Sequence, residues 1–145
     1  MNKAINQYKN VSVESGLEGA SPYQITKKLL DGCMIFLKQA KVAVQNKDYE
    51  KKSFHISKTQ AIITTLAASL QSDKNEEVSG NLLALYDFCL NELITASSEM
   101  KVDKIESVEK VMGEIKAGWD SIPMDAVIEA ENMRQKGPQV STDAG

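Results

Sequence analysis

The sequence predicts an all-α protein: an antiparallel up-down four-helix bundle with an extended N-terminal arm. Three observations lead to this fold class. The three prolines lie at positions 22, 123 and 138, so residues 23–122 contain no proline, and no segment there alternates between apolar and polar residues. Apolar residues instead recur at three- and four-residue steps in four segments of about 20 residues. The turns between these segments are only a few residues long, which is typical of antiparallel neighbours in a bundle.

The first helix is predicted over residues 21–46, after an arm that shows no helical period. Ser21 is a suitable N-cap, Pro22 suits the first helical position, and Gln24 can close a capping box. The apolar positions that follow have helical spacing and end before the "NKD" turn: Ile25, Leu29, Cys33, Phe36, Leu37, Ala40 and Val44. The two cysteines, Cys33 and Cys89, lie among such apolar positions and are expected to be buried thiols.

The second helix is predicted over residues 49–71 and the third over 76–99. In the fourth, Asp103 is the expected N-cap and Glu106 closes a capping box. A narrow apolar stripe follows, so we expect its members to be core: Ile105, Val108, Met112, Ile115, Trp119 and Ile122. A short fifth helix fits "PMDAVIEAENMRQKG", ended by Gly137 and Pro138, with a mobile tail behind it. The expected regions are an arm (1–20), a bundle domain (21–122), and a short helix with tail (123–145).

The third helix, "GNLLALYDFCLNELITAS", is apolar over more of its circumference than one buried stripe requires. At about 100° per residue, a core stripe comprises Val78, Leu82, Leu85, Tyr86, Cys89, Leu93, Ala96 and Met100. Leu83, Leu90 and Ile94 widen the apolar arc to about 180°, against about 100° for an ordinary surface helix. Two explanations stay open: the helix packs on both of its neighbours, or it borders a groove that receives another apolar helix.

Composition argues against several classes of partner. The chain has 145 residues and a net charge of −3, and Arg134 is its only arginine, so we expect no nucleic-acid partner. No segment approaches the roughly 20 apolar residues that span a bilayer, and the N-terminus lacks the apolar core of a signal peptide. We therefore expect a cytoplasmic protein that does not insert into membranes.

The sequence also offers little catalytic chemistry. His55 is the single histidine, no histidine and cysteine cluster can hold a metal, and no glycine-rich phosphate loop is present. We expect neither an enzyme nor a cofactor. One alternative is that "HISKTQA" resembles the His-x-x-Lys segment of histidine phosphotransfer domains, although Thr59 stands where those domains usually have glycine. That hypothesis requires a solvent-exposed His55. Another alternative is a generic scaffold for a helical partner.

Several stretches together resemble the flagellar export chaperones specific for flagellin, the FliS family. The resemblance covers about residues 7–122, and it is carried by "QYKNVSVES", "ASPYQITKKLLDGCMIFLKQA", "GNLLALYDFCLNELITAS" and "AGWDSI". The most specific pieces are Ser21-Pro22, Asp31-Gly32 and the string from Asn81 to Asp87. The chain departs from the family at Leu30, where many members have tyrosine, and in lacking a Gly-Gly before the third helix.

The resemblance implies a cytoplasmic four-helix chaperone that binds the disordered C-terminal segment of flagellin one to one. Such a chaperone prevents premature polymerisation and assists delivery to the export gate of the flagellar type III apparatus. An N-terminal arm covers the client groove when it is empty.

On this chain, the predicted groove residues are Ile62, Ile63, Leu66, Leu82, Leu83, Leu90 and Ile94. Tyr8, Val11 and Val13 are predicted to form the lid or a contact with the export gate. Asn81 is a candidate for hydrogen bonding to the client backbone, and an inward structural role is the alternative.

Overall fold

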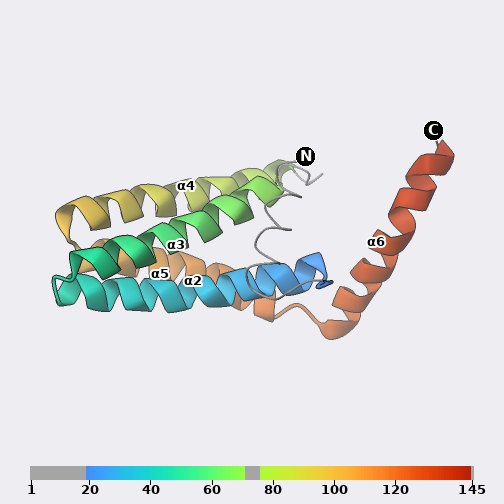
Figure 1. Ribbon diagram of the computed structural model, residues 1–145. Helices are drawn as coiled ribbons and strands as arrows, with labels where there is room; N and C mark the ends of the chain where they lie inside the picture. Colours follow the sequence, from blue (N-terminus) through green and yellow to red (C-terminus); the bar gives the residue numbers. More distant parts are fainter. Residues whose placement is uncertain (1–18, 71–75, 145) are drawn as a thin grey trace.

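The computed structural model describes residues 19–70 and 76–144, all of whose regular structure is helical. The helices are α2 (Pro22–Gln45), α3 (Tyr49–Ser69), α4 (Glu76–Glu99), α5 (Val102–Asp120) and α6 (Met124–Ala144). Figure 1 shows α2 to α5 lying side by side along their lengths. The predicted arm, with Tyr8, Val11 and Val13, falls outside the described residues except for its last two positions.

The four helices of the bundle form a closed ring of neighbours. Each packs against the next in the chain, and α5 returns to pack against α2. The turns between consecutive helices are short, so the helices alternate in direction, as antiparallel neighbours do. The all-α, up-down bundle predicted from the sequence is therefore confirmed. The fifth helix, α6, leaves the end of α5 and projects away from the bundle (Figure 1).

Local sequence signals set the start of α2 and the turn that follows it. The predicted capping box is present: Gln24 N–H donates to Ser21 Oγ at 3.2 Å, and Ser21 N–H donates to Gln24 Oε1 at 3.0 Å. After α2 the chain turns at Lys47, whose φ is +55°. Asp48 then caps α3 by accepting a hydrogen bond from Lys51 N–H at 3.1 Å.

The predicted capping box of the fourth helix was wrong. The N-cap of α5 is Lys101, which makes no side-chain cap hydrogen bond, and Asp103 lies within the first turn. The reason is the compact connection before it: Met100 adopts a left-handed conformation with φ +54°, and Lys101 N–H donates to Ala96 O at 3.2 Å. The helix therefore begins at Val102, and Asp103 supports it through the helix dipole instead.

The fifth helix also differs from its prediction in length. Its backbone stays helical to Ala144, past Gly137 and Pro138, where the sequence predicts its end. A proline inside a helix removes one hydrogen bond and favours a kink, and it need not terminate the helix.

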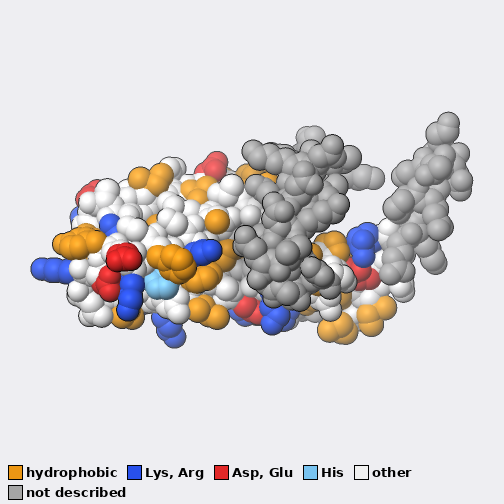
Figure 2. Space-filling model, in the orientation of Figure 1, with side chains coloured by type: hydrophobic (Ala, Val, Ile, Leu, Met, Phe, Trp, Pro, Cys, Tyr) orange, Lys and Arg blue, Asp and Glu red, His pale blue; other side chains and the backbone are white. Residues whose placement is uncertain are grey.

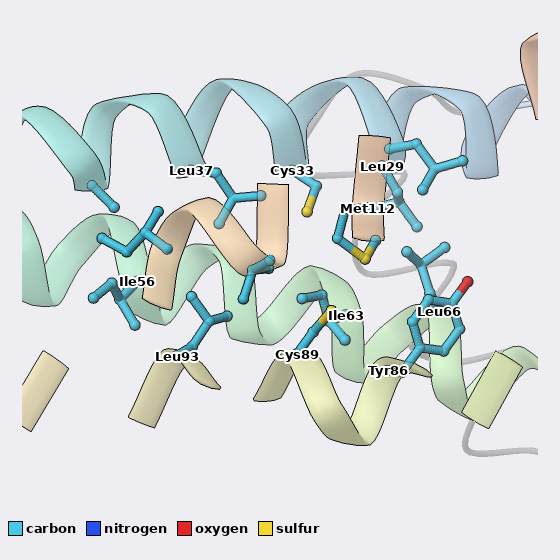
Figure 3. Packing of buried hydrophobic residues seen from close by; sticks show 14 of the residues in the cluster. Leu29, Cys33, Leu37, Ile56, Ile63, Leu66, Tyr86, Cys89, Leu93 and Met112 are labelled. Carbon is cyan, nitrogen blue, oxygen red and sulfur yellow. The ribbon is translucent and has the colours of Figure 1, made fainter. Parts of the chain in front are cut away.

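The core lies between the four bundle helices, and each contributes one apolar stripe. Figure 3 shows Leu29, Cys33 and Leu37 of α2 pointing toward Ile63 of α3 and Met112 of α5. Both cysteines are free and buried, as expected. Two sets of ions join α5 to α2: Lys41 pairs with Glu109 at 2.8 Å, and Lys27 pairs with Asp120 at 2.9 Å. The second set also includes Lys116, which pairs with both Asp120 and Asp31.

Candidate partner-binding surface

The apolar circumference of α4 is partly core and partly surface. The centre of the predicted stripe is buried, namely Tyr86, Cys89, Leu93 and Ala96. Leu82 and Met100 are partly buried and pack against this core. The core prediction was wrong for Val78 and Leu85, which are 48% and 40% exposed. Helical geometry places Val78 and Leu85 at the edge of the stripe that faces away from α3. The side chains of α5 do not cover this edge.

Leu83, Leu90 and Ile94 occupy the opposite flank of α4, the side that faces α3. Ile94 is 58% exposed, whereas Leu83 and Leu90 are partly buried. Ile94 lines an open hollow of about 480 Å³ together with Tyr49, Lys52 and Gln60 of α3, and with Ser97, Ser98 and Met100. Leu83, Leu90 and Ile94 are seven and then four residues apart, so they form one row along the α3/α4 seam. We call this row the seam row.

The α3 residues assigned to the same groove lie elsewhere. Ile63 and Leu66 are buried in the core, so they support the seam from inside and do not line its surface. Ile62 is partly buried on the α2 side of α3: a Cβ added to Gly32 of α2 would lie 3.7 Å from Ile62 Cδ1. On the α4 side, α3 instead presents Tyr49 and Gln60. A helical wheel correctly places Ile62 and Ile63 on the apolar side of α3, but it does not show which neighbouring helix covers each of them.

A second row of exposed side chains follows the other flank of α4, and the sequence pattern predicted only part of it. Val78, Asn81, Leu85 and Phe88 follow one another at steps of three, four and three residues, and all four side chains are exposed. Asn81 therefore does not take the inward role that was one of its alternatives. Sequence reasoning missed Phe88, although its spacing of three from Leu85 and seven from Asn81 was a readable signal. We call these four residues the outer row.

His55 is half-buried: aromatic rings flank it, and the rest of its side chain borders an open hollow between α2 and α3. Its ring lies 6.1 Å from that of Phe36 and 5.2 Å, edge-on, from that of Phe54, measured between centroids. Its Nδ1 is buried and has no hydrogen-bond partner in the described part of the chain. The lysine of the His-x-x-Lys segment, Lys58, lies over the Phe54 ring at 5.6 Å. The phosphotransfer hypothesis requires a fully exposed imidazole, whereas this ring is only partly exposed and its Nδ1 is buried.

Trp119 and Ile115 pack against the core, in agreement with their prediction. The Trp119 ring stacks on Tyr23 at the start of α2, with 5.4 Å between centroids. These contacts secure the end of α5 against α2 and leave the indole with a structural role.

The two buried cysteines of the core are thiols held in the neutral form. Burial raises the pKa of Cys33 to about 12, with a further contribution from nearby Cys89. Burial likewise raises the pKa of Cys89 to about 11. Such thiols are poor nucleophiles and poor metal ligands at neutral pH. Within the described residues, no group of three histidine, cysteine or acidic side chains is placed to bind a metal, and no helix is long and apolar enough to cross a bilayer.

Comparison with known proteins identifies the family. A family model described as flagellar protein FliS matches residues 4–126. The chain belongs to the FliS family. The match takes in all four helices of the bundle and only the first three residues of α6. Members of this family are chaperones, so the chain is a chaperone of flagellar export and not an enzyme.

Curated relatives agree with this assignment over most of the chain. The flagellar secretion chaperone FliSB of Pseudomonas aeruginosa is 32% identical over 120 residues, which cover 83% of this chain and 95% of the relative. The flagellar secretion chaperone FliS of Vibrio cholerae is 33% identical, covering 85% of this chain and 90% of the relative. The one from Salmonella typhimurium is 34% identical, covering 81% and 88%.

Proposed function

We propose that this member of the FliS family binds the disordered C-terminal segment of flagellin, one molecule to one, in the cytoplasm. It would prevent premature polymerisation of that segment and assist its delivery to the export gate of the flagellar type III apparatus. The observation that carries the proposal is the seam row of α4, whose outermost member, Ile94, faces solvent above an open hollow. An apolar helix of the client would cover it.

The physical basis is coupled folding and binding. A disordered client gains apolar burial when it forms amphipathic helices on the bundle, and it loses conformational entropy in doing so. The two terms oppose each other, so a long interface can form and still be released without nucleotide hydrolysis. No residue of the chain needs to act as a catalyst in this cycle.

The outer row extends the proposed client surface to the other flank of α4. Val78, Leu85 and Phe88 offer apolar contacts there, and the Asn81 amide lies between them with both donor and acceptor groups. A second client segment could pack on the three apolar side chains and hydrogen-bond through its backbone to Asn81. Tyr8, Val11 and Val13, which precede the described residues, remain the proposed lid or export-gate contact.

Isothermal titration calorimetry tests the client. The purified chain is titrated with the C-terminal segment of flagellin from the same cell, at several temperatures. We expect saturable one-to-one binding with a large negative heat-capacity change, because apolar surface is buried. The Ile94→Asp and Leu83→Asp variants are expected to bind at least about tenfold more weakly, since each places a charge in the apolar contact.

The matched control is Ile35→Asp on α2. Ile35 is 57% exposed and Ile94 is 58% exposed, so the two substitutions place the same charge at equally accessible isoleucines. Circular dichroism first establishes that each variant keeps the helical spectrum of the parent. Loss of binding in the Ile35 variant with none in the Ile94 variant would move the client off the α3/α4 seam. Absence of binding by the folded parent chain would rule out flagellin as the client.

A further inference from the structure

The fifth helix is the part of the chain that the family match leaves unexplained. The FliS model ends at residue 126, and α6 continues from Met124 to Ala144. Figure 1 shows this helix standing away from the bundle. Its first residues line a hollow against the start of α2, and Val127 is buried there. Met124 and Ile128 border the same hollow, but unlike Val127 they remain largely exposed.

The exposed surface of α6 is amphipathic and acidic. Met124 and Ile128 lie one turn apart on the same side and are 64% and 55% exposed. Residues 124–134 contain three acidic side chains and one basic one, Arg134, which pairs with Glu131 at 2.9 Å. The other two acids, Asp125 and Glu129, are one turn apart and exposed, directly beside the Met124 and Ile128 pair. The helix therefore carries an apolar strip with a negative border.

The seam between α2 and α3 has the complementary character. An open hollow of about 540 Å³ there is walled by exposed Ile35 and Val42 of α2 and by His55 of α3. Its charged lining residues are Lys38, Lys51 and Asp48, and Asp48 pairs with Lys51 at 4.0 Å, which leaves Lys38 as the positive charge not paired within the hollow. Figure 2 shows the histidine on this face with hydrophobic, lysine and acidic side chains around it. Two other lysines of α2 and α3 point elsewhere: Lys41 pairs with Glu109 of α5, and Lys52 donates a hydrogen bond to Ser97 O of α4. No ion pair engages Lys38 among the residues that the structure describes.

We propose that the α2/α3 hollow is a docking site for α6 of a second copy of this chain. Met124 and Ile128 of one protomer would pack on Ile35 and Val42 of its partner. Glu129 and Asp125 would then lie beside Lys38. Such an exchange is reciprocal in a two-fold dimer, because each protomer supplies one helix and one hollow.

The same helix cannot reach the hollow of its own bundle. Met124, Val127 and Ile128 border a hollow that Ser21 and Tyr23, at the start of α2, line from the other side. At about 1.5 Å per residue, Ile128 is roughly 6 Å along α6, whereas Ile35 is roughly 20 Å beyond Pro22 along α2. If α6 folded back along α2, its apolar strip would cover the first turns of α2 and miss the hollow. A second copy is free of this constraint.

Sedimentation equilibrium of the full chain, from low micromolar to near millimolar concentration, tests the proposal. We expect a monomer–dimer equilibrium that weakens as salt is added, because charged groups border the contact. Ile128→Asp and Val42→Asp are each expected to weaken dimerisation at least about tenfold. Glu129→Lys should also weaken dimerisation. Combining Glu129→Lys with Lys38→Glu should restore dimerisation, since the two opposite charges then face each other with their positions exchanged.

The matched control is Met133→Asp. Met133 is 65% exposed but lies about half a turn away from Met124, on the opposite side of α6, so this variant should dimerise like the parent. Ile94→Asp should do likewise, because it alters the proposed client surface instead. Monomers throughout the concentration range, or a dimer equally weakened by Met133→Asp and Ile128→Asp, would overturn the proposal. Neither result bears on flagellin binding, which is measured separately.

Discussion

At the scale of single residues, two positions adopt a backbone conformation that their side chains disfavour. Lys47 and Met100 have φ values of +55° and +54°, and each lies in the turn that ends a helix. A Cβ atom makes this left-handed region unfavourable, and glycine usually occupies it at helix ends. Since Lys47 and Met100 stand where glycine is usual, no glycine marks either turn in the sequence. For that reason the predicted N-cap of α5 was placed at Asp103 and not at Lys101.

Lys47→Gly is expected to raise the free energy of unfolding by about 1 kcal/mol, because Lys47 is exposed and the change removes only the strained Cβ. Gln45→Gly, at the last residue of α2, is the control and should lower it by a similar amount, as glycine does inside helices. Urea denaturation followed by circular dichroism measures both. Equal effects of the two substitutions would show that the left-handed turn is not strained.

The buried thiols predict how stability depends on alkaline pH. Burial raises the pKa values of Cys33 and Cys89 to about 12 and about 11, from an ordinary value of 9.0. Above about pH 9 the unfolded thiols lose protons that the folded ones keep, so the free energy of unfolding should fall as pH rises toward 11. The slope from two thiols approaches about 2.7 kcal/mol per pH unit. Denaturation at a series of pH values, compared with the Cys33→Ala/Cys89→Ala variant, isolates this contribution; parallel curves would contradict it.

At the scale of helices, sequence reasoning succeeded where the signal is local. Ser21, Pro22 and Gln24 contain all the atoms of a capping box, so the start of α2 could be predicted. It failed at α5, because Asp103 and Glu106 have the spacing of a capping box while the preceding turn starts the helix two residues earlier. A capping motif predicts a helix start only if the chain before it is free to adopt the N-cap conformation.

The N-cap of α5, Lys101, is a position where a substitution should stabilise the helix. Its φ of −108° and ψ of 113° suit an N-cap, but its side chain accepts no hydrogen bond from the helix. Lys101→Ser is expected to raise the free energy of unfolding by about 1 kcal/mol, by supplying that acceptor and removing a positive charge from the positive end of the dipole. Thermal melts measure the change. Asp103→Asn tests whether Asp103 acts only through the helix dipole. This substitution should lower the free energy of unfolding by well under the roughly 1 kcal/mol that is lost when a true N-cap is removed.

At the scale of the whole molecule, the sequence predicted that α4 is too apolar for one core stripe, and that was correct. It could not assign the flanks, because a helical wheel gives directions around one helix and says nothing about the neighbours. Only the closed ring of α2 to α5 shows that Ile63 is enclosed, that Ile94 borders an open seam, and that Val78 and Leu85 lie beyond the cover of α5. The candidate surface therefore follows from the arrangement of the bundle as much as from its composition.

The separation of α6 from the bundle leads to a last prediction. A chain that ends after Ile122 loses α6 but keeps every helix of the ring and the Trp119 stack on Tyr23. The main buried contact that the truncated chain loses is that of Val127. The free energy of unfolding should therefore fall by only about 1 kcal/mol. Flagellin binding should persist in this truncated chain, because the seam row and the outer row are intact, whereas dimerisation should disappear. Calorimetry and sedimentation of the same sample measure the two properties. A truncated chain that unfolds would show that α6 is part of the bundle, and one that still dimerises would place the contact between copies elsewhere.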